Sequence, residues 1–371
     1  MYQKIVSTRE EGQRLDKYLH KILPEAGNGF LCKMLRKKSI TLNDKKADAG
    51  DKICSGDVLK IYFSDDTLSK FMNGSNDDDC SKNGNRNSNG NCNSNGNRSN
   101  TDNGAGSRLK EECLSYRNCY KKFKDKIDIL FEDEDIVAAD KPAGILSQKA
   151  EKTDVSVNEW LIGYMLESGE MDEDELSLFR PSVCNRLDRN TSGIILCGKT
   201  ITGEQILSEM LRERTLDKYY LAAVTGRIDK PQEIKGYLSK NHRTNKVVIT
   251  QTHDNESADS DEIHTYYRPL SYDKDNDATI IEVKLITGKT HQIRAHLSSV
   301  GHPLIGDVKY GNEKRNRYFR DRYGIRSQML HCSRVEFPED ERLKEASKVV
   351  ILSPVPQKFV SVFGNIYEDR Y

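Results

Sequence analysis

Residues 185–200 read NRLDRNTSGIILCGKT, and this stretch organises the larger part of the chain. From Gly193 onward it is a continuous apolar run with polar residues at its end, which predicts a buried strand. Before Gly193 it is a polar loop, in which Asp188 lies between Arg186 and Arg189. The small hydroxyl and amide side chains that follow can bond the local backbone, and glycine permits a conformation that other residues resist. The loop is therefore either a surface turn or a mount for a reactive carboxylate.

Further strands are predicted on both sides of this stretch. Residues 127–148 contain two short strands that meet at the turn EDED, and DKYYLAAVTG (217–226) and ATIIEVKL (278–285) are strands as well. Helical patterns lie at 155–169 and 202–214, and a short helix is expected within 285–307. Because strands predominate and the helices are irregularly placed, we expect an α+β fold with a mixed, mostly antiparallel central sheet.

The composition is that of a globular protein without an overall charge. Charged residues make up 31% and hydrophobic residues 36% of the chain, and the formal net charge is zero, which excludes a uniformly basic coat protein for nucleic acid. The first residues lack the apolar core of a secretory signal, and we expect a cytoplasmic protein without a membrane segment. Nine cysteines without a CxxC pair favour reduced thiols over disulfides or a zinc site.

A segment rich in Asn, Ser and Gly divides the chain. Between residues 73 and 107 almost no apolar side chain is available to offset the entropy of ordering, which predicts a flexible tether. We place the domain boundaries at 1–64 for an amino-terminal domain, 65–120 for the linker and 121–371 for a catalytic domain.

The amino-terminal domain combines two helical patterns with short strands. RLDKYL (14–19), the basic run LRKKSITLN (35–43) and LKIYF (59–63) resemble the αL RNA-binding domain named after small-subunit ribosomal protein S-four. The resemblance implies a small α/β domain whose basic residues contact RNA phosphates. The implied contacts are Arg14, Lys33, Arg36, Lys37 and Lys38; a merely solvated helix face is the alternative for the basic run.

The larger part of the chain resembles the RluA-type pseudouridine synthases. RLDRNTSG (186–193) is similar to their catalytic signature, and three further motifs follow the family order: DKPAG (140–144), DKYYLAAVTG (217–226) and LITGKTHQIRAHLSSVGHPLIGDVKYG (285–311). The resemblance implies the pseudouridine synthase catalytic fold and the isomerisation of uridine to pseudouridine in RNA. It implies no cofactor and no metal, and we expect a monomer.

The resemblance also implies roles for individual residues. Asp188 would be the catalytic aspartate, Tyr220 would pack against the target base, and Arg294 would pair with Asp188. Arg186 would occupy the RNA stack and help to extrude the uridine, since an atom inside a stacked helix is out of reach of a side chain. Attack of Asp188 at C1′ and proton abstraction at C2′ remain open, and Tyr220 is a candidate to assist proton removal from C5.

Two positions depart from the family pattern, and both are expected near RNA. Asn185 stands where the family commonly has histidine, and Lys289 replaces an arginine, which keeps the charge but loses the planar fork. His291, in the same motif, is a further expected RNA contact. Large-subunit ribosomal RNA is the expected substrate by family analogy. The alternatives are a synthase acting on tRNA and a non-catalytic RNA-binding protein of ribosome assembly.

Two other features have competing interpretations. His291, His296, His302 and His331 suggest a metal-dependent hydrolase, but their spacing fits no common metal motif, so RNA-facing or core histidines are favoured. Residues 312–328, NEKRNRYFRDRYGIRSQ, either meet RNA with cations and stacking aromatics or form an exposed helix with a half-buried aromatic side.

Overall fold

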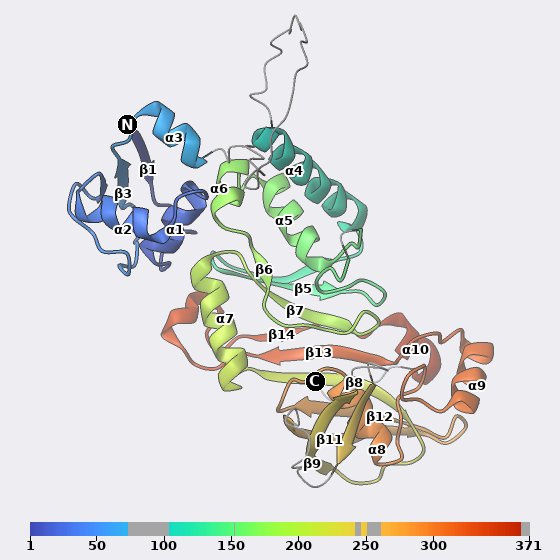
Figure 1. Ribbon diagram of the computed structural model, residues 1–371. Helices are drawn as coiled ribbons and strands as arrows, with labels where there is room; N and C mark the ends of the chain where they lie inside the picture. The colour runs from blue at the N-terminus through green and yellow to red at the C-terminus, as the bar shows by residue number, and fades with distance from the viewer. Residues whose placement is uncertain (73–103, 152, 242–245, 251–260, 365–371) are drawn as a thin grey trace, which may run out of the picture. The chain divides into compact units, whose positions relative to one another are not determined.

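The computed structural model describes residues 1–72, 104–151, 153–241, 246–250 and 261–364. The chain divides into two compact units (Figure 1). Unit 1 contains Met1–Asn118 and Gly163–Arg180, and unit 2 contains Cys119–Ile162 and Pro181–Tyr371.

Unit 1 contains a small antiparallel sheet with helices. Its strands β1 (Tyr2–Ile5), β2 (Ile40–Leu42) and β3 (Val58–Ile61) have the order β1-β3-β2. Its first helices are α1 (Leu15–Ile22), α2 (Asn28–Arg36) and α3 (Asp65–Met72). The four apolar positions of α1 that recur at helical spacing are buried in one core with Leu31 and Leu35 of α2. The two predicted helices are thus present, with their apolar faces inward.

The predicted linker, 65–120, was drawn too wide at both ends. Helix α3 occupies its start, where Leu68 joins the core of unit 1, and α4 (Gly104–Phe123) occupies its end. In α4 the buried residues Cys113, Tyr116 and Cys119 recur every three positions, a helical pattern that the polar composition around it concealed. Most of the predicted tether, 73–103, lies outside the described residues.

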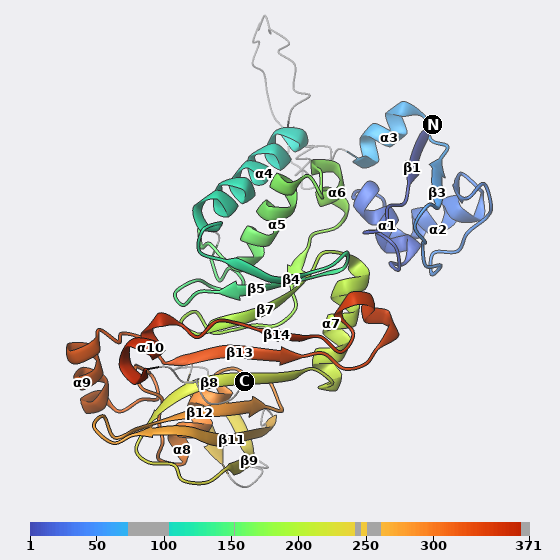
Figure 2. The ribbon, with the colours of Figure 1, turned by 180° about the vertical axis from the view of Figure 1, so that it is seen from behind.

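Unit 2 is built on one large sheet. Its strands follow the order β10-β9-β11-β12-β8-β13-β7-β5-β4, with β14 beside β13 and β6 beside β7 (Figure 2). Their bounds are β4 (Asp128–Glu132), β5 (Ile136–Lys141), β6 (Ser182–Val183), β7 (Ser192–Gly198), β8 (Asp217–Thr225), β9 (Gln232–Asn241), β10 (Lys246–Thr250), β11 (Asp261–Asp273), β12 (Ala278–Leu285), β13 (Leu330–Glu336) and β14 (Val350–Leu352). Of the described pairs, β13 with β7 is parallel and the others are antiparallel. The predicted α+β class with a mixed, mostly antiparallel sheet is confirmed.

Strand β7 is buried along its whole length because both of its faces are covered. Ile194 and Leu196 belong to a core with α7 (Ile201–Glu213) and α8 (Gln292–Ser299), whereas Ile195 and Cys197 belong to a core with α5 (Val157–Ser168). Each fully buried aliphatic side chain contributes about 1.5–3 kcal/mol to the stability of the fold. This two-sided burial explains why the strand is a continuous apolar run.

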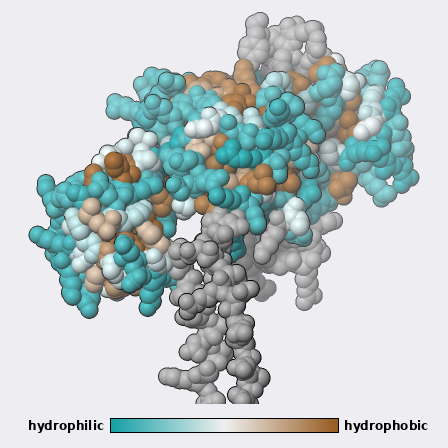
Figure 3. Space-filling model, turned by 90° about the horizontal axis from the view of Figure 1, so that it is seen from above, coloured by the Kyte–Doolittle hydropathy of each residue, from teal (hydrophilic) through white to brown (hydrophobic). Residues whose placement is uncertain are grey.

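The remaining helices are short. They are α6 (Glu173–Leu178) in unit 1, and α9 (Glu313–Tyr323), α10 (Gln357–Phe363) and the 3-10 helix η1 (Glu341–Ala346) in unit 2. Hydrophilic residues predominate on the face shown in Figure 3, with hydrophobic residues in small groups among them.

The seven cysteines of the described ranges are free thiols. No helix in those ranges combines the length and the apolar character needed to cross a bilayer.

Candidate active site

The loop between β6 and β7 carries Asp188 and is held close to β13. Its backbone forms a turn in which the Thr191 N–H donates to the Asp188 carbonyl (3.0 Å). Gly193 has φ +109°, and a Cβ at this position would lie 2.2 Å from the Cys332 carbonyl oxygen of β13. A glycine is therefore required where the parallel pair β7–β13 begins.

The carboxylate of Asp188 contacts a guanidinium that lies 106 residues further along the chain. Arg294 Nη1 of α8 donates to Asp188 Oδ2 at 2.7 Å, and the Arg294 side chain is only 8% exposed. His291 Nε2 lies 3.9 Å from the other oxygen, Oδ1. The bond from Arg294 therefore fixes one carboxylate oxygen of Asp188. Because the Asp188 side chain is 24% exposed, the carboxylate remains accessible to a substrate.

A second carboxylate, Asp307, lies within the 285–311 motif without a predicted role, and it holds Arg294 on the side away from Asp188. Asp307 accepts from Arg294 Nε (2.7 Å) and Nη2 (2.9 Å), and its Oδ1 also accepts from the backbone N–H of Lys309 and Tyr310. Burial alone would lower the pKa of Arg294, but Asp307 and Asp188 outweigh it and raise that pKa. Burial would raise the pKa of Asp307, yet the bonds to Arg294 lower it. Both groups therefore stay charged, and Arg294 has one orientation.

Tyr220 of β8 is buried in the same region. Its side chain is packed in the core that also contains Leu187 and Cys332. Burial raises the pKa of the Tyr220 phenol well above its ordinary value, and the charges of Cys332 and Asp188 act in the same direction. The phenol is therefore neutral near pH 7, which disfavours the phenolate that a base for C5 would need.

Known proteins with similar sequences share these elements. A family model described as RNA pseudouridylate synthase matches residues 135–299, which span β5, the Asp188 loop, β8 and α8. A ribosomal large subunit pseudouridine synthase C of Rickettsia bellii is 28% identical over 305 residues, covering 82% of this chain and 85% of the relative. An uncharacterised RNA pseudouridine synthase of Mycoplasma genitalium is 26% identical over 348 residues, covering 92% and 90%. Together, these sequence matches identify the chain as an RNA pseudouridine synthase.

One solved structure supports the fold of the synthase. The structure titled human RNA pseudouridylate synthase domain containing 4 has a TM-score of 0.52 and 19% identity, and the match covers 67% of this chain and 95% of that one. The sequence matches, rather than this likeness of fold, identify the synthase as an isomerase that acts on RNA.

Lys141, from the DKPAG motif, ties the Asp188 loop of the synthase to the end of β5. Its ammonium group is fully buried and donates to the carbonyls of Ile145 (2.7 Å), Pro142 and Arg189 (both 3.1 Å). The Gly144 N–H donates to the same Arg189 carbonyl. Burial lowers the pKa of Lys141 to about 7, although the charge of Asp188 opposes this shift. The motif thus fixes the position of the Asp188 loop.

Asn185, which was predicted to contact RNA, has its side-chain amide bonded inside the protein instead. Its side chain is buried; Oδ1 accepts from the Leu196 N–H (2.7 Å), and Nδ2 donates to the Ile194 carbonyl (3.5 Å). Both polar groups of the amide are thus occupied by the backbone of β7. The next residue, Arg186, is exposed and remains accessible to RNA.

The two other predicted RNA contacts in the 285–311 motif differ in their exposure. His291 is half-buried beside Asp188, and its Nδ1 shares a hydrogen bond with the Tyr310 hydroxyl (3.1 Å). Burial lowers the pKa of His291, which makes the ring neutral. Lys289 is exposed and forms an ion pair with Asp261 (2.6 Å).

Two of the other histidines are core residues. His331 is buried between the hydroxyls of Ser192 (3.0 Å) and Ser353 (3.1 Å), and burial lowers its pKa to about 4. His296 is also buried, and its pKa is lowered to about 4 for the same reason. In the described part of the chain, no three His, Cys, Asp or Glu side chains converge as a metal site would require.

The basic residues predicted to bind RNA in unit 1 lie on its surface. Lys33, Arg36, Lys37 and Lys38, at the end of α2, are all exposed. Arg14 is exposed as well, but it pairs with Asp16 (2.7 Å). The α2 group is therefore the freer of the two for phosphates.

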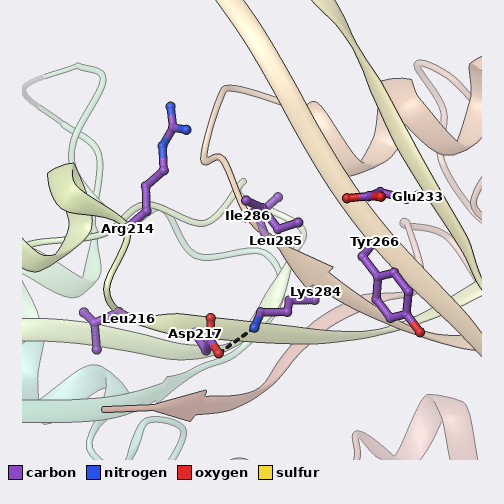
Figure 4. Close-up of a pocket in the computed structure, with 8 residues that line it drawn as sticks. All are labelled: Arg214, Leu216, Asp217, Glu233, Tyr266, Lys284, Leu285 and Ile286. Atoms are coloured by element: carbon purple, nitrogen blue, oxygen red, sulfur yellow. Dashed lines mark hydrogen bonds and ion pairs between the residues drawn. The ribbon is translucent and has the colours of Figure 1, made fainter. Parts of the chain in front are cut away.

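A cavity of about 450 Å³ in unit 2 of the synthase does not contain Asp188 in its lining. Its lining comes from the starts of β8 and β9, the end of β12 and Tyr266 within β11 (Figure 4). Lys284 in its wall is paired with Asp217 (2.6 Å), and Glu233 supplies a second carboxylate. Because its cations are balanced by acids, this cavity is not suited to a phosphate.

Proposed function

We propose that the synthase modifies uridines of large-subunit ribosomal RNA and that Asp188 is its catalytic residue. The observation that carries the proposal is the carboxylate of Asp188, which is partly exposed and has one oxygen fixed by Arg294. The names of relatives that cover most of the chain support this substrate, since several are ribosomal large subunit pseudouridine synthases.

The isomerisation needs one group at the sugar and room for the base to turn. The C1′–N1 bond breaks, the base rotates, and C5 bonds to C1′ while the C5 proton is lost and N1 gains a proton. The carboxylate of Asp188 serves either as the nucleophile at C1′ or as the base at C2′, and Arg294 orients it in both cases. Neutral Tyr220 would then pack against the base.

RNA capture supplies the remaining requirements. Arg186 is exposed two residues before Asp188, where it would fill the place of the extruded uridine. The exposed basic end of α2 supports the interpretation of residues 1–64 as an S-four-type RNA-binding domain, which would contact phosphates without reading sequence.

The Asp188→Asn variant tests the catalytic assignment. It keeps the shape but removes the nucleophile and base, so the single-turnover rate should fall roughly 100- to 10,000-fold, while RNA affinity stays near that of the wild type. Asp229→Asn, at an exposed aspartate paired with Arg227, is the control. Turnover by Asp188→Asn at the wild-type rate would refute the assignment.

Mapping pseudouridines in cells with and without the gene tests the substrate. We expect sites in large-subunit ribosomal RNA to disappear. Loss confined to tRNA would identify a tRNA synthase instead. No loss in any RNA, together with inactive wild-type protein, would favour the non-catalytic role in ribosome assembly.

A further inference from the structure

We infer that α9 and the turn beside Asp307 form a second anion site, which holds a phosphate of the RNA strand next to the target uridine. This inference rests on the proposed function, because it names a surface by which the same active site holds its substrate. The segment 312–328 left two interpretations open in the sequence, and the structure distinguishes between its aromatic and its basic residues.

The aromatic side of α9 faces the protein. Phe319 is fully buried, and the hydroxyls of Tyr318 and Tyr323 both donate to Asn276 Oδ1 (3.0 and 2.9 Å). Arg315 lies over the rings of Tyr318 and Phe319 and donates to the carbonyls of Asn276 and Asp277. These rings are fixed against the β11–β12 turn, so they are not available to stack on bases.

The opposite side of α9 is a row of exposed cations. Lys314, Arg317 and Arg320 are exposed, and Arg326 continues the row beyond the helix. Arg322 is exposed too, but it lies over the rings of Tyr318 and Tyr323 on the aromatic side. The acids nearby are Glu313, paired with Arg317 (3.1 Å), and Asp321, paired with Arg320 (3.2 Å). Residues 312–328 hold six basic and two acidic residues, whereas the whole chain is neutral. Such a local excess is the electrostatic footprint of a phosphate-binding surface.

Part of this row and the turn around Asp307 line one hollow. Its volume is about 350 Å³, and it is lined by Gly306, Val308, Asn316, Arg320, Ile325 and Arg326. Two guanidiniums are in this lining and no carboxylate is, in contrast to the cavity of Figure 4. Guanidinium forks match the oxygens of a phosphate, which makes an RNA phosphodiester the fitting occupant.

The hollow is rigidly connected to the catalytic carboxylate. Asn316 of α9 accepts from the Gly306 N–H and donates to the Asp307 carbonyl, both at 2.8 Å. Gly306 and Val308 flank Asp307, which holds Arg294 and, through it, Asp188. A phosphate bound here would therefore be placed at a fixed position relative to Asp188, to which the hollow is connected through Asp307 and Arg294.

The double variant Arg320→Gln/Arg326→Gln tests the site, with Arg212→Gln/Lys348→Gln as the control that removes two exposed cations elsewhere in unit 2. Affinity is measured by fluorescence anisotropy with a labelled oligouridylate and with transcribed large-subunit ribosomal RNA. Both pairs are made in the Asp188→Asn background, so that binding is read without turnover.

We expect the α9 pair to weaken binding about tenfold or more, since it removes charge-assisted bonds, and the control pair to weaken it much less. The slope of log affinity against log salt should fall by about 0.7 for each phosphate that the protein no longer neutralises. In the active background, the RNA concentration for half-maximal rate should rise by a larger factor than the saturated single-turnover rate falls. Equal affinities and slopes for the two pairs would overturn the inference. Inactive wild-type protein would defeat the proposed function and leave the binding test intact.

Discussion

Asp307→Asn is the change that most directly tests how the active site is held. Asp307 is fully buried and accepts four hydrogen bonds, two from Arg294 and two from backbone N–H groups. Asparagine has the same shape, but its amide nitrogen would face a donor, either the guanidinium or the backbone. At least one charge-assisted hydrogen bond is removed, at a cost of about 1.5–3 kcal/mol.

Asp307→Asn is expected to lower the reaction rate because it disturbs the orientation of Arg294. If the same 1.5–3 kcal/mol is lost in the orientation of Arg294 toward Asp188, the saturated single-turnover rate falls roughly 10- to 100-fold. Because a buried guanidinium loses one partner, the free energy of unfolding falls by about 3 kcal/mol as well. RNA affinity should change little, since Asp307 itself is not exposed.

The assay is quench-flow formation of pseudouridine at saturating RNA, with urea unfolding of the same samples. Asp135→Asn is the matched control, because Asp135 is also a buried carboxylate of unit 2, bonded by Thr200 and Lys344. The control should lose stability and keep its rate. A folded Asp307→Asn protein with a wild-type saturated rate would show that Asp307 does not position Arg294.

Three further expectations follow from buried polar groups. Above its pKa of about 7, the Lys141 amine is neutral and has only two hydrogens for its three carbonyl partners, so it holds the Asp188 loop less firmly. Single-turnover rates should therefore fall as pH rises through about 7, and a flat profile from about pH 6 to about pH 9 would contradict this. The lowered pKa of His331, about 4, means that the unfolded chain takes up this proton first as pH falls. Stability from this group is therefore present above about pH 6.5 and lost toward pH 4, by roughly 3 kcal/mol in urea titrations, and a His331→Asn protein should lose less. Asn185→Ala should cost about 1–3 kcal/mol of stability, measured by urea unfolding, with little change in saturated rate; a large loss of rate in folded protein would restore a role in substrate handling.

Local patterns predicted the strands and helices that have a simple reason to form. Strand β7 is an uninterrupted apolar run because both faces are covered, and α1 buries each of its periodic apolar residues. The linker boundary failed for the converse reason. Among the side chains of α4 that the structure describes, the buried ones are two cysteines and a tyrosine. They lie among many charged residues, and a composition window does not distinguish such a segment from a tether.

The active site was predictable only in part, because its contacts join distant segments. No local pattern connects Asp188 to Arg294 across 106 residues, and only the family motifs suggested their pairing. Asp307 was missed because Gly306-Asp307 reads as an ordinary turn. Its function depends on burial and on the arrival of Arg294, neither of which a linear pattern contains.

Asn185 shows how the same limit affects the interpretation of a departure from a family. In the sequence, an amide in place of histidine beside a catalytic aspartate suggests a change in RNA contact. In the structure, the amide accepts a hydrogen bond from the Leu196 N–H and donates one to the Ile194 carbonyl. Both bonds attach the loop to β7. A histidine ring nitrogen can accept from the same Leu196 N–H, so either residue can fix the loop. Asparagine in place of histidine therefore preserves the hydrogen bond from the Leu196 N–H. We infer that this bond, more than the type of side chain that accepts it, fixes the position of Asp188.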